Sequence, residues 1–270
     1  MRLLRRRLAR RSMVVLTASL ALIVAFGAWP PAAAASTATD METQILRLMN
    51  KDRVARGLVP YRKWGSLATV AGRRATRMAE RNSMTHTAAG GDVGAELTRN
   101  GIQWYDWGEA IGKTGYAWGS QAAAHLYSLW KGSTGHRALL FNSGFNYVGI
   151  GVAYRSSNRQ TFASIVFTDS RDHTRPVATL TGATLQGTTI DLTWSGYDPR
   201  LQVRTAGLHS FDVQQRVDGG TWTTILDDTT LRALTLADRV RGHVYEYRVR
   251  SKDRKGNLAT WTSVRSVSLR

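Results

Sequence analysis

Apolar residues in the first half of the chain recur every three to four positions, which is the spacing of one face of a helix. Residues 42–82 predict two such helices, of which the first ends before Gly57 and the second covers residues 66–82. The apolar stripe of the second helix is narrow and made of small side chains, so it allows close packing against a neighbour. Shorter helices are predicted at residues 92–101 and 120–131.

The periodicity changes after residue 146. Residues 147–154 and 161–167 predict two strands, and the polar residues 156–158 form the turn between them. Helices followed by a strand pair favour a layered α+β domain with a sheet between two layers of helices. We expect this domain to cover residues 36–172.

The second half shows short alternating stretches and no helical pattern. After a linker at residues 173–176, strands are predicted at residues 189–194, 210–217, 221–226 and 244–251. Glycine-containing turns separate them, and about seven short strands fit into fewer than 100 residues. This spacing predicts an all-β sandwich over residues 177–270.

The composition is that of a globular protein that lacks thiol chemistry. Of the 270 residues, 43% are hydrophobic and 21% are charged, and there is no cysteine. Disulfides, thiolate metal sites and thiol nucleophiles are therefore excluded, and the domains depend on their cores for stability.

The first 35 residues have the pattern of an export signal. Six arginines come before an apolar stretch at residues 13–28, and the alanines at 32–35 supply a cleavage site. The pair Arg10-Arg11 also fits a twin-arginine signal, so the export route stays open. The apolar stretch is short for a membrane anchor. We therefore expect a secreted protein that has no transmembrane segment after cleavage.

The chain is strongly basic, with a net charge of +18 that includes the six arginines of residues 1–35. The remaining excess is spread over both halves and favours association with an anionic cell-envelope polymer. No basic helix carries interleaved aromatic residues, so we expect no specific nucleic-acid partner.

Histidine chemistry remains after the common catalytic motifs are excluded. The chain contains no Walker A loop, no G-x-G-x-x-G fingerprint after a strand and no G-x-S-x-G elbow. Five stretches instead resemble motifs of bacterial CAP proteins (SCP-like; cysteine-rich secretory proteins, antigen 5 and pathogenesis-related 1 proteins). They are NKDRVARGL at 50–58, MTHT at 84–87, GEAI at 108–111, W..STGHRALL at 130–140 and GIGV at 149–152. The resemblance covers residues 42–170 and implies an α-β-α sandwich with a central cleft.

The resemblance also implies that His86, Glu109 and His136 line this cleft. Two imidazoles and a carboxylate can bind Zn²⁺ or another divalent cation and leave a position open. The same three groups can form an acid/base cluster, or they can bridge helices and loops by hydrogen bonds. Residues 131–134 lack the second glutamate of many family members, which lowers the expected metal affinity.

Aromatic residues near Glu109 are candidates for a ligand surface. We predict that they cluster around this carboxylate and either line an apolar cleft for a lipid or glycan or pack between helices. The remaining histidines are expected to be structural. The aromatic residues are Trp104, Tyr105, Trp107, Tyr116 and Trp118, and the histidines are His125, His173, His209 and His243.

The second half resembles fibronectin type III and bacterial Ig-like domains. The stretches that carry this resemblance are residues 192–195, 211–222 and 242–253. Tyr245 takes the place of the tyrosine-corner residue, whose hydroxyl bonds back to the backbone. Such a module implies spacing or adhesion and no catalysis.

These features together predict an exported, monomeric CAP protein that acts as an extracellular binding module for a lipid, glycan or protein. The sandwich would hold it near an envelope polymer, and released and wall-associated forms both stay open. We expect a binding protein more than an enzyme. The alternative is a secreted peptidase-like or esterase-like hydrolase that uses Glu109 and the histidines, and a third is an adhesive protein with a vestigial cleft.

Overall fold

The computed structural model describes residues 37–270. The predicted signal at residues 1–35 lies outside the described residues, so its cleavage stays a prediction. Across residues 37–270, no helix combines the length and the apolar character needed to span a membrane.

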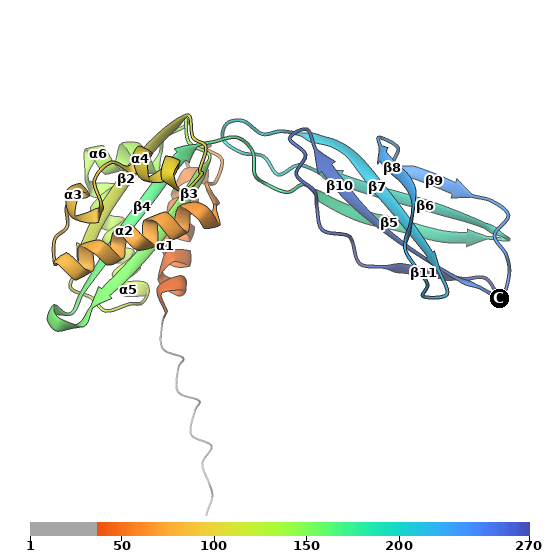
Figure 1. The fold of residues 1–270 in the computed structure, drawn as a ribbon, viewed down its shortest axis with the longest axis horizontal. Coiled ribbons are helices and arrows are strands. Elements are labelled where there is room, and N and C mark those ends of the chain that lie inside the picture. The colour runs from red at the N-terminus through yellow and green to blue at the C-terminus, as the bar shows by residue number, and fades with distance from the viewer. Residues whose placement is uncertain (1–36) are drawn as a thin grey trace, which may run out of the picture. The chain divides into compact units, whose positions relative to one another are not determined.

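A four-stranded sheet forms the centre of the first domain (Figure 1). Its order is β1-β3-β4-β2, with β3 antiparallel to β4, β4 antiparallel to β2, and β1 parallel to β3. The predicted strand pair is confirmed as β3 and β4. The strands are β1 (Arg62–Lys63), β2 (Asp106–Thr114), β3 (Tyr147–Arg155) and β4 (Gln160–Asp169).

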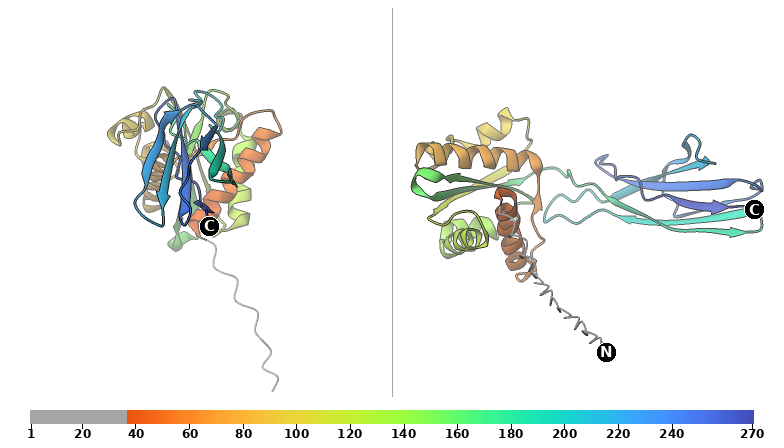
Figure 2. Two further views of the ribbon diagram at one scale, coloured as in Figure 1. Left: turned by 90° about the vertical axis from the view of Figure 1, so that its right-hand side faces the viewer. Right: turned by 90° about the horizontal axis from the view of Figure 1, so that it is seen from below.

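Helices cover both faces of this sheet. The helix α2 packs on β3 and β4 on one face, and α1 and α5 lie on the other (Figure 2). The predicted α+β sandwich of helix, sheet and helix layers is therefore confirmed. The helices are α1 (Ala38–Val54), α2 (Gly65–Arg81), α3 (His86–Ala89), α4 (Val93–Arg99), α5 (Ser120–Gly132) and α6 (Thr134–Leu140).

The helix α1 begins four residues before the predicted start because a capping box holds its first turn. The side chain of Thr37 accepts from the backbone N–H of Asp40, and the Asp40 carboxylate accepts from the backbone N–H of Thr37. Buried Met41, Ile45 and Met49 then follow at helical spacing and face the core.

The strand β2, which carries Glu109, is absent from the sequence prediction. Glycines at 108 and 112 interrupt its apolar pattern. A Cβ at Gly108 would meet Leu139 at 2.6 Å, and one at Gly112 would meet Trp130 at 3.0 Å. Close packing of α5 and α6 on β2 therefore requires glycine at both positions, and the same glycines weaken the apolar pattern that would predict a strand.

The second half is a sandwich of two antiparallel sheets with the predicted seven strands. The sheet orders are β11-β10-β7-β8 and β5-β6-β9. The hydroxyl of Tyr245 accepts from the backbone N–H of Val240 at 3.0 Å, which confirms the predicted tyrosine corner. The strands are β5 (Val177–Gln186), β6 (Thr189–Tyr197), β7 (Leu208–Val217), β8 (Thr223–Thr229), β9 (Ala233–Leu236), β10 (Val244–Asp253) and β11 (Arg265–Ser268).

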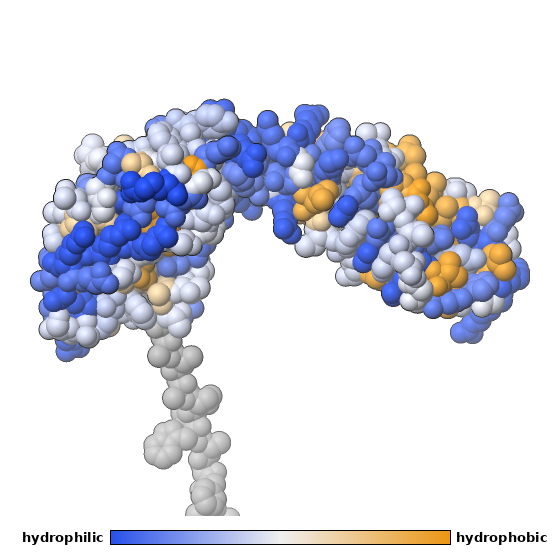
Figure 3. Space-filling view, in the orientation of Figure 1, coloured by the Kyte–Doolittle hydropathy of each residue, from blue (hydrophilic) through white to orange (hydrophobic). Residues whose placement is uncertain are grey.

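A hydrophilic band crosses the surface over α2 (Figure 3). Arg73 and Arg81 are exposed on this helix and Arg77 is half-buried, whereas Arg74 points into the interior. Arg74 is the arginine of α2 that contacts the candidate site.

Candidate functional site

Glu109 lies in the buried middle of β2 and accepts four hydrogen bonds. Arg74 on α2 donates from Nε to Oε1 at 2.6 Å and from Nη2 to Oε2 at 2.8 Å. The Ser164 hydroxyl on β4 donates to Oε1 at 2.8 Å, and Nδ1 of His86 lies 2.6 Å from Oε2. A carboxylate offers about four lone-pair positions, so these partners use its whole accepting capacity.

The paired charges keep both ions of this cluster in their charged forms. Burial raises the pKa of Glu109, but the hydrogen bonds and charge of Arg74 outweigh it, so the pKa is lowered. Burial lowers the pKa of Arg74, but Glu109 and Glu96 outweigh it and the pKa is raised. Glu109 is therefore an anion at neutral pH.

His86 occupies the first position of α3, where the side chain of Thr85 caps the helix by accepting from the backbone N–H of Ala88 at 3.0 Å. Because Glu109 is ionised and can only accept, Nδ1 of His86 carries the hydrogen of this bond. The side chain of His86 is 59% exposed, so its other nitrogen, Nε2, is left as an acceptor at the surface of the site.

His136 lies in α6 and is half-buried. Burial lowers the pKa of His136, and repulsion from His86 when both rings carry a proton lowers it further, so His136 is neutral at neutral pH. The structure thus bonds His86 to Glu109 and brings His136 within electrostatic range of His86.

A cavity of about 540 Å³ opens beside the His86–Glu109 pair. Its size is within the range of small-molecule pockets. Trp107 supplies an aromatic side, and Asp92 and Val93 at the start of α4 line another part. His136 does not line this cavity.

The hydrogen-bond partners of Glu109 argue against this carboxylate as a metal ligand. All its lone pairs are used, and the adjacent Arg74 is a buried cation that opposes a second positive charge. Within residues 37–270, the ligand atoms of His86, Glu109 and His136 do not form a group lying mutually within 4.8 Å. The two imidazoles are the donors that remain for a metal, and its presence stays a prediction.

The periodicity of α2 could have revealed Arg74, which the sequence prediction missed. Arg74 falls among the buried Ala71, Ala75 and Met78, where an arginine requires an acidic partner. Glu96 on α4 is a second missed residue. It is buried and accepts from Arg74 at 2.8 Å and from Arg77 at 2.9 Å.

Of the five aromatic residues predicted near Glu109, one is among the residues that line its cleft. Trp107 lines the cleft, but Trp104 and Tyr105 line a separate hollow beside Thr98. Trp118 lines a third cavity.

A structural role is observed for two of the other histidines. Nδ1 of His125 lies 2.9 Å from the hydroxyl of Thr114, and the ring of His173 stacks on Trp64 with centroids 4.2 Å apart. These contacts agree with the predicted structural role.

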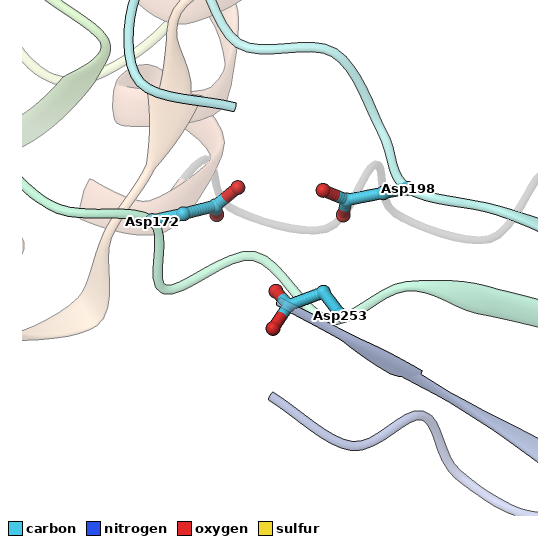
Figure 4. Close-up of side chains that lie close together, drawn as sticks. All are labelled: Asp172, Asp198 and Asp253. Atoms are coloured by element: carbon cyan, nitrogen blue, oxygen red, sulfur yellow. The ribbon is translucent and has the colours of Figure 1, made fainter. Parts of the chain in front are cut away.

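A second group of ionisable side chains lies where the first domain is followed by the sandwich (Figure 4). Asp172, Asp198 and Asp253 offer oxygens that lie within 4.8 Å of one another. Each accepts from backbone N–H groups, as Asp172 does from Thr174 and Ala206. These bonds shape the turns of the junction, and no arginine or lysine among the described residues forms an ion pair with the three carboxylates.

Burial raises the pKa of Asp198 to about 6, and the charges of Asp172 and Asp253 add to the rise. The backbone N–H of Gly207 acts in the opposite direction. The carboxylates therefore repel one another at neutral pH, and a proton on Asp198 relieves this repulsion.

The comparisons with known proteins agree with this architecture. The model of the Cysteine-rich secretory protein family, CAP, matches residues 46–168. No sequence among the curated proteins matches the chain.

Solved structures resemble each half separately. An extracellular protein with an SCP domain from Bacillus anthracis is 27% identical over 48% of this chain and 40% of its own, with a TM-score of 0.41. A cysteine-rich secretory protein from Staphylococcus aureus is 20% identical over 50% and 40%, with a TM-score of 0.40. An Fn3-like protein from Clostridium thermocellum is 25% identical over 34% and 90%, with a TM-score of 0.26.

The chain thus spans 40% of the length of the Bacillus and Staphylococcus proteins. Residues 46–168 form a CAP domain, and the chain joins it to a C-terminal β-sandwich that resembles fibronectin type III-like structures.

Proposed function

We propose that this chain is an exported protein that acts outside the cell as a binding module, with the cleft beside His86 as its ligand site. The basic, apolar and alanine-rich pattern of residues 1–35 supports export, as does the secretory family of the CAP domain. The basic charge of the sandwich supports attachment to an anionic envelope polymer.

The four hydrogen bonds to Glu109 are the observation that favours binding over catalysis. A general base needs a free lone pair, and a nucleophilic carboxylate needs an accessible oxygen. Glu109 has neither, because Arg74, Ser164 and His86 occupy both oxygens and its side chain is 1% exposed. The carboxylate orients His86, whose Nε2 can accept a hydrogen bond from a ligand.

The cleft suits a ligand with both polar and apolar parts. Trp107 offers an aromatic surface, while Asp92 and His86 offer hydrogen-bonding groups around the same cavity. A glycan, a lipid headgroup or a protein side chain would satisfy this combination.

Retention on envelope material tests the binding function. We expect the full chain to be retained on purified wall glycan or on envelope-lipid vesicles, and His86→Ala to reduce retention at least tenfold. His209→Ala is the matched control, since it removes an exposed imidazole from the sandwich. Equal retention of the wild type and His86→Ala would reject the cleft as the ligand site.

Titration with Zn²⁺ tests the metal. If the two imidazoles hold a cation, the heat of binding disappears in His86→Ala and in His136→Ala but persists in Glu109→Gln. Null heats for the wild-type protein would reject the metal, and loss of binding in Glu109→Gln would restore the carboxylate as a ligand.

The short bond between His86 and Glu109 favours one second candidate, a hydrolase in which His86 Nε2 takes a proton from water. A carboxylate that orients a histidine is the arrangement of general-base sites. Turnover of peptide, ester or wall-fragment substrates that is lost in His86→Ala would establish the hydrolase, and no turnover would leave the binding function alone.

A further inference from the structure

A second cavity of about 530 Å³ lies at the far end of the CAP sheet, beside the last residues of β3. It shares no lining residue with the cleft at His86. Its walls come from the C-terminal half of α2, the first residue of α1, the β3–β4 hairpin and Trp118. It has no part in the proposed cleft function.

The floor of this cavity is an open strand edge. The strand β1 pairs with β3 at Tyr147 and Val148 alone, and Trp64 donates to the carbonyl of Val148 just beyond the pairing. Because backbone groups alternate along a strand, the N–H and C=O groups of Val152 and Tyr154 point to the same edge. Among the described residues, no further strand pairs with that edge.

Arg155 brings an unused cation to the end of this edge. Its Nη1 donates to the carbonyls of Ala79 at 2.9 Å and Glu80 at 3.0 Å, at the C-terminal end of α2. Its Nε has no partner, and no carboxylate among the described residues lies within ion-pair distance of its guanidinium. Nε is buried, but Nη2 also lacks a partner and is not buried, so Nη2 is the nitrogen left to bind a carboxylate.

Aromatic side chains complete the cavity. Trp118 is 39% exposed, and its ring centroid lies 6.3 Å from that of Tyr154. An exposed indole beside Tyr154 offers a surface for an apolar side chain.

We propose that this cavity binds the C-terminal end of a short extended peptide. The α-carboxylate pairs with Arg155, and the peptide backbone adds to the free edge of β3 at Val152 and Tyr154, parallel to β3 as β1 is. A side chain of the peptide packs on Trp118. Charge complementarity selects the carboxylate, and the unpaired backbone groups select a peptide over a ligand that offers a carboxylate alone.

The test compares free acids with amides on the full chain. The probes are a pool of N-acetylated tetrapeptides with randomised side chains and the same pool as C-terminal amides, followed by amide NMR. We expect the acid pool to shift the N–H signals of Val152 and Tyr154 and to slow their exchange, and the amide pool to bind at least tenfold more weakly. Equal effects of the two pools, or no shift at these amides, would overturn the proposal.

Variants assign the site. Arg155→Gln is expected to reduce acid-pool binding to that of the amides, whereas Arg159→Gln, which removes an arginine next to the same hairpin turn, leaves it unchanged. The comparison of pools on the wild type stands even if Arg155→Gln weakens the end of α2. Binding that is lost in His86→Ala but kept in Arg155→Gln would overturn this proposal and leave the cleft function intact.

Discussion

Arg74 carries its charge into the interior of the CAP domain, where its side chain is 0% exposed and contacts two carboxylates. Its planar guanidinium bonds Glu109 by two parallel contacts and reaches Glu96 with the remaining nitrogen. This geometry matches the fork of an arginine and not the single point charge of a lysine. Arg74 thereby holds the carboxylate that orients His86.

Replacement of Arg74 by methionine should destabilise the protein strongly. The variant leaves Glu109 and Glu96 buried without their common cation, and loss of one partner of a buried ion pair costs about 3–5 kcal/mol. Urea unfolding followed by circular dichroism measures this loss. The pKa of Glu109 should also rise, which NMR titration of the carboxyl carbon detects.

Arg73→Met is the matched control, because Arg73 is a neighbouring arginine whose side chain is 44% exposed and lies 3.9 Å from Glu96. We expect this change to cost less than about 0.5 kcal/mol. Similar losses for the two variants would show that the buried network does not depend on Arg74.

The sequence identifies His86 and Glu109 by motif, but it does not give the state of their polar atoms. Family motifs place these two residues at the cleft, and their 2.6 Å contact agrees with that placement. The occupancy of the Glu109 lone pairs depends on Arg74, which is 35 positions away, and on Ser164, which is 55 away. No local pattern encodes such a contact, although an arginine inside the apolar stripe of α2 is a visible signal.

At the scale of elements, the contact of α2 with β3 fixes the core of the CAP domain. The small side chains of α2 let it approach the glycines of β3, as the narrow stripe predicts. A Cβ at Gly149 would overlap the backbone of Leu67, and one at Gly151 would overlap the backbone of Gly72. Backbone atoms cannot move aside as a side chain does, so these glycines are required by packing.

Gly151→Ala should therefore destabilise the CAP domain by about 3 kcal/mol, at the upper end of the cost of overpacking. Gly72→Ala lies on the helix side of the same contact, but its Cβ meets nothing within 4 Å. That change should leave stability unaltered or raise it by up to about 1 kcal/mol, because alanine favours a helix. Thermal unfolding of both variants gives the comparison, and a neutral Gly151→Ala would mean that α2 and β3 lie farther apart.

An element can be predicted from the sequence when enough of its residues carry apolar side chains at the right spacing. Apolar side chains predict strands β3 and β4 although Gly149 and Gly151 lie within β3, and the apolar stripe predicts α2 to within one residue at each end. The pattern does not predict β2, because Glu109 and Lys113 accompany Gly108 and Gly112 and leave few apolar side chains in the strand. Helix α3 has four residues, which is too short to show a helical periodicity. The capping residue Thr85 is the feature of the sequence that could indicate this helix.

At the scale of the whole molecule, a loop of the sandwich contacts the CAP domain. Leu201 is 1% exposed and belongs to a core cluster with Tyr147 of β3, and Arg204 bonds Asp169 at 2.6 Å. Asp172 accepts from the backbone N–H of Ala206 on the same loop. The sequence predicts a four-residue linker here, but it does not reveal these contacts because they join residues about 30 or more positions apart.

Asp198 makes this junction sensitive to pH. Its pKa of about 6 in the folded protein lies above the ordinary value of 3.8, so the folded state holds the proton more tightly than the unfolded state. The contribution of Asp198 to stability is therefore highest below pH 4 and decreases as the pH rises toward 6. Above that range its contribution is constant. Asp198→Asn removes the titration and retains an oxygen that can accept from Gly207.

We expect Asp198→Asn to be more stable than the wild type by about 1 kcal/mol at pH 7.5, less than a fully buried carboxylate would give, because solvent screens the half-buried side chain. The difference should shrink toward pH 4 and vanish below about pH 3, where Asp198 is protonated in both states. Asp227→Asn, at an exposed position of β8, should give no pH-dependent difference. Urea unfolding at four pH values between 4 and 7.5 follows both variants, and a wild type more stable than Asp198→Asn at pH 7.5 would show that the three carboxylates are not in repulsion.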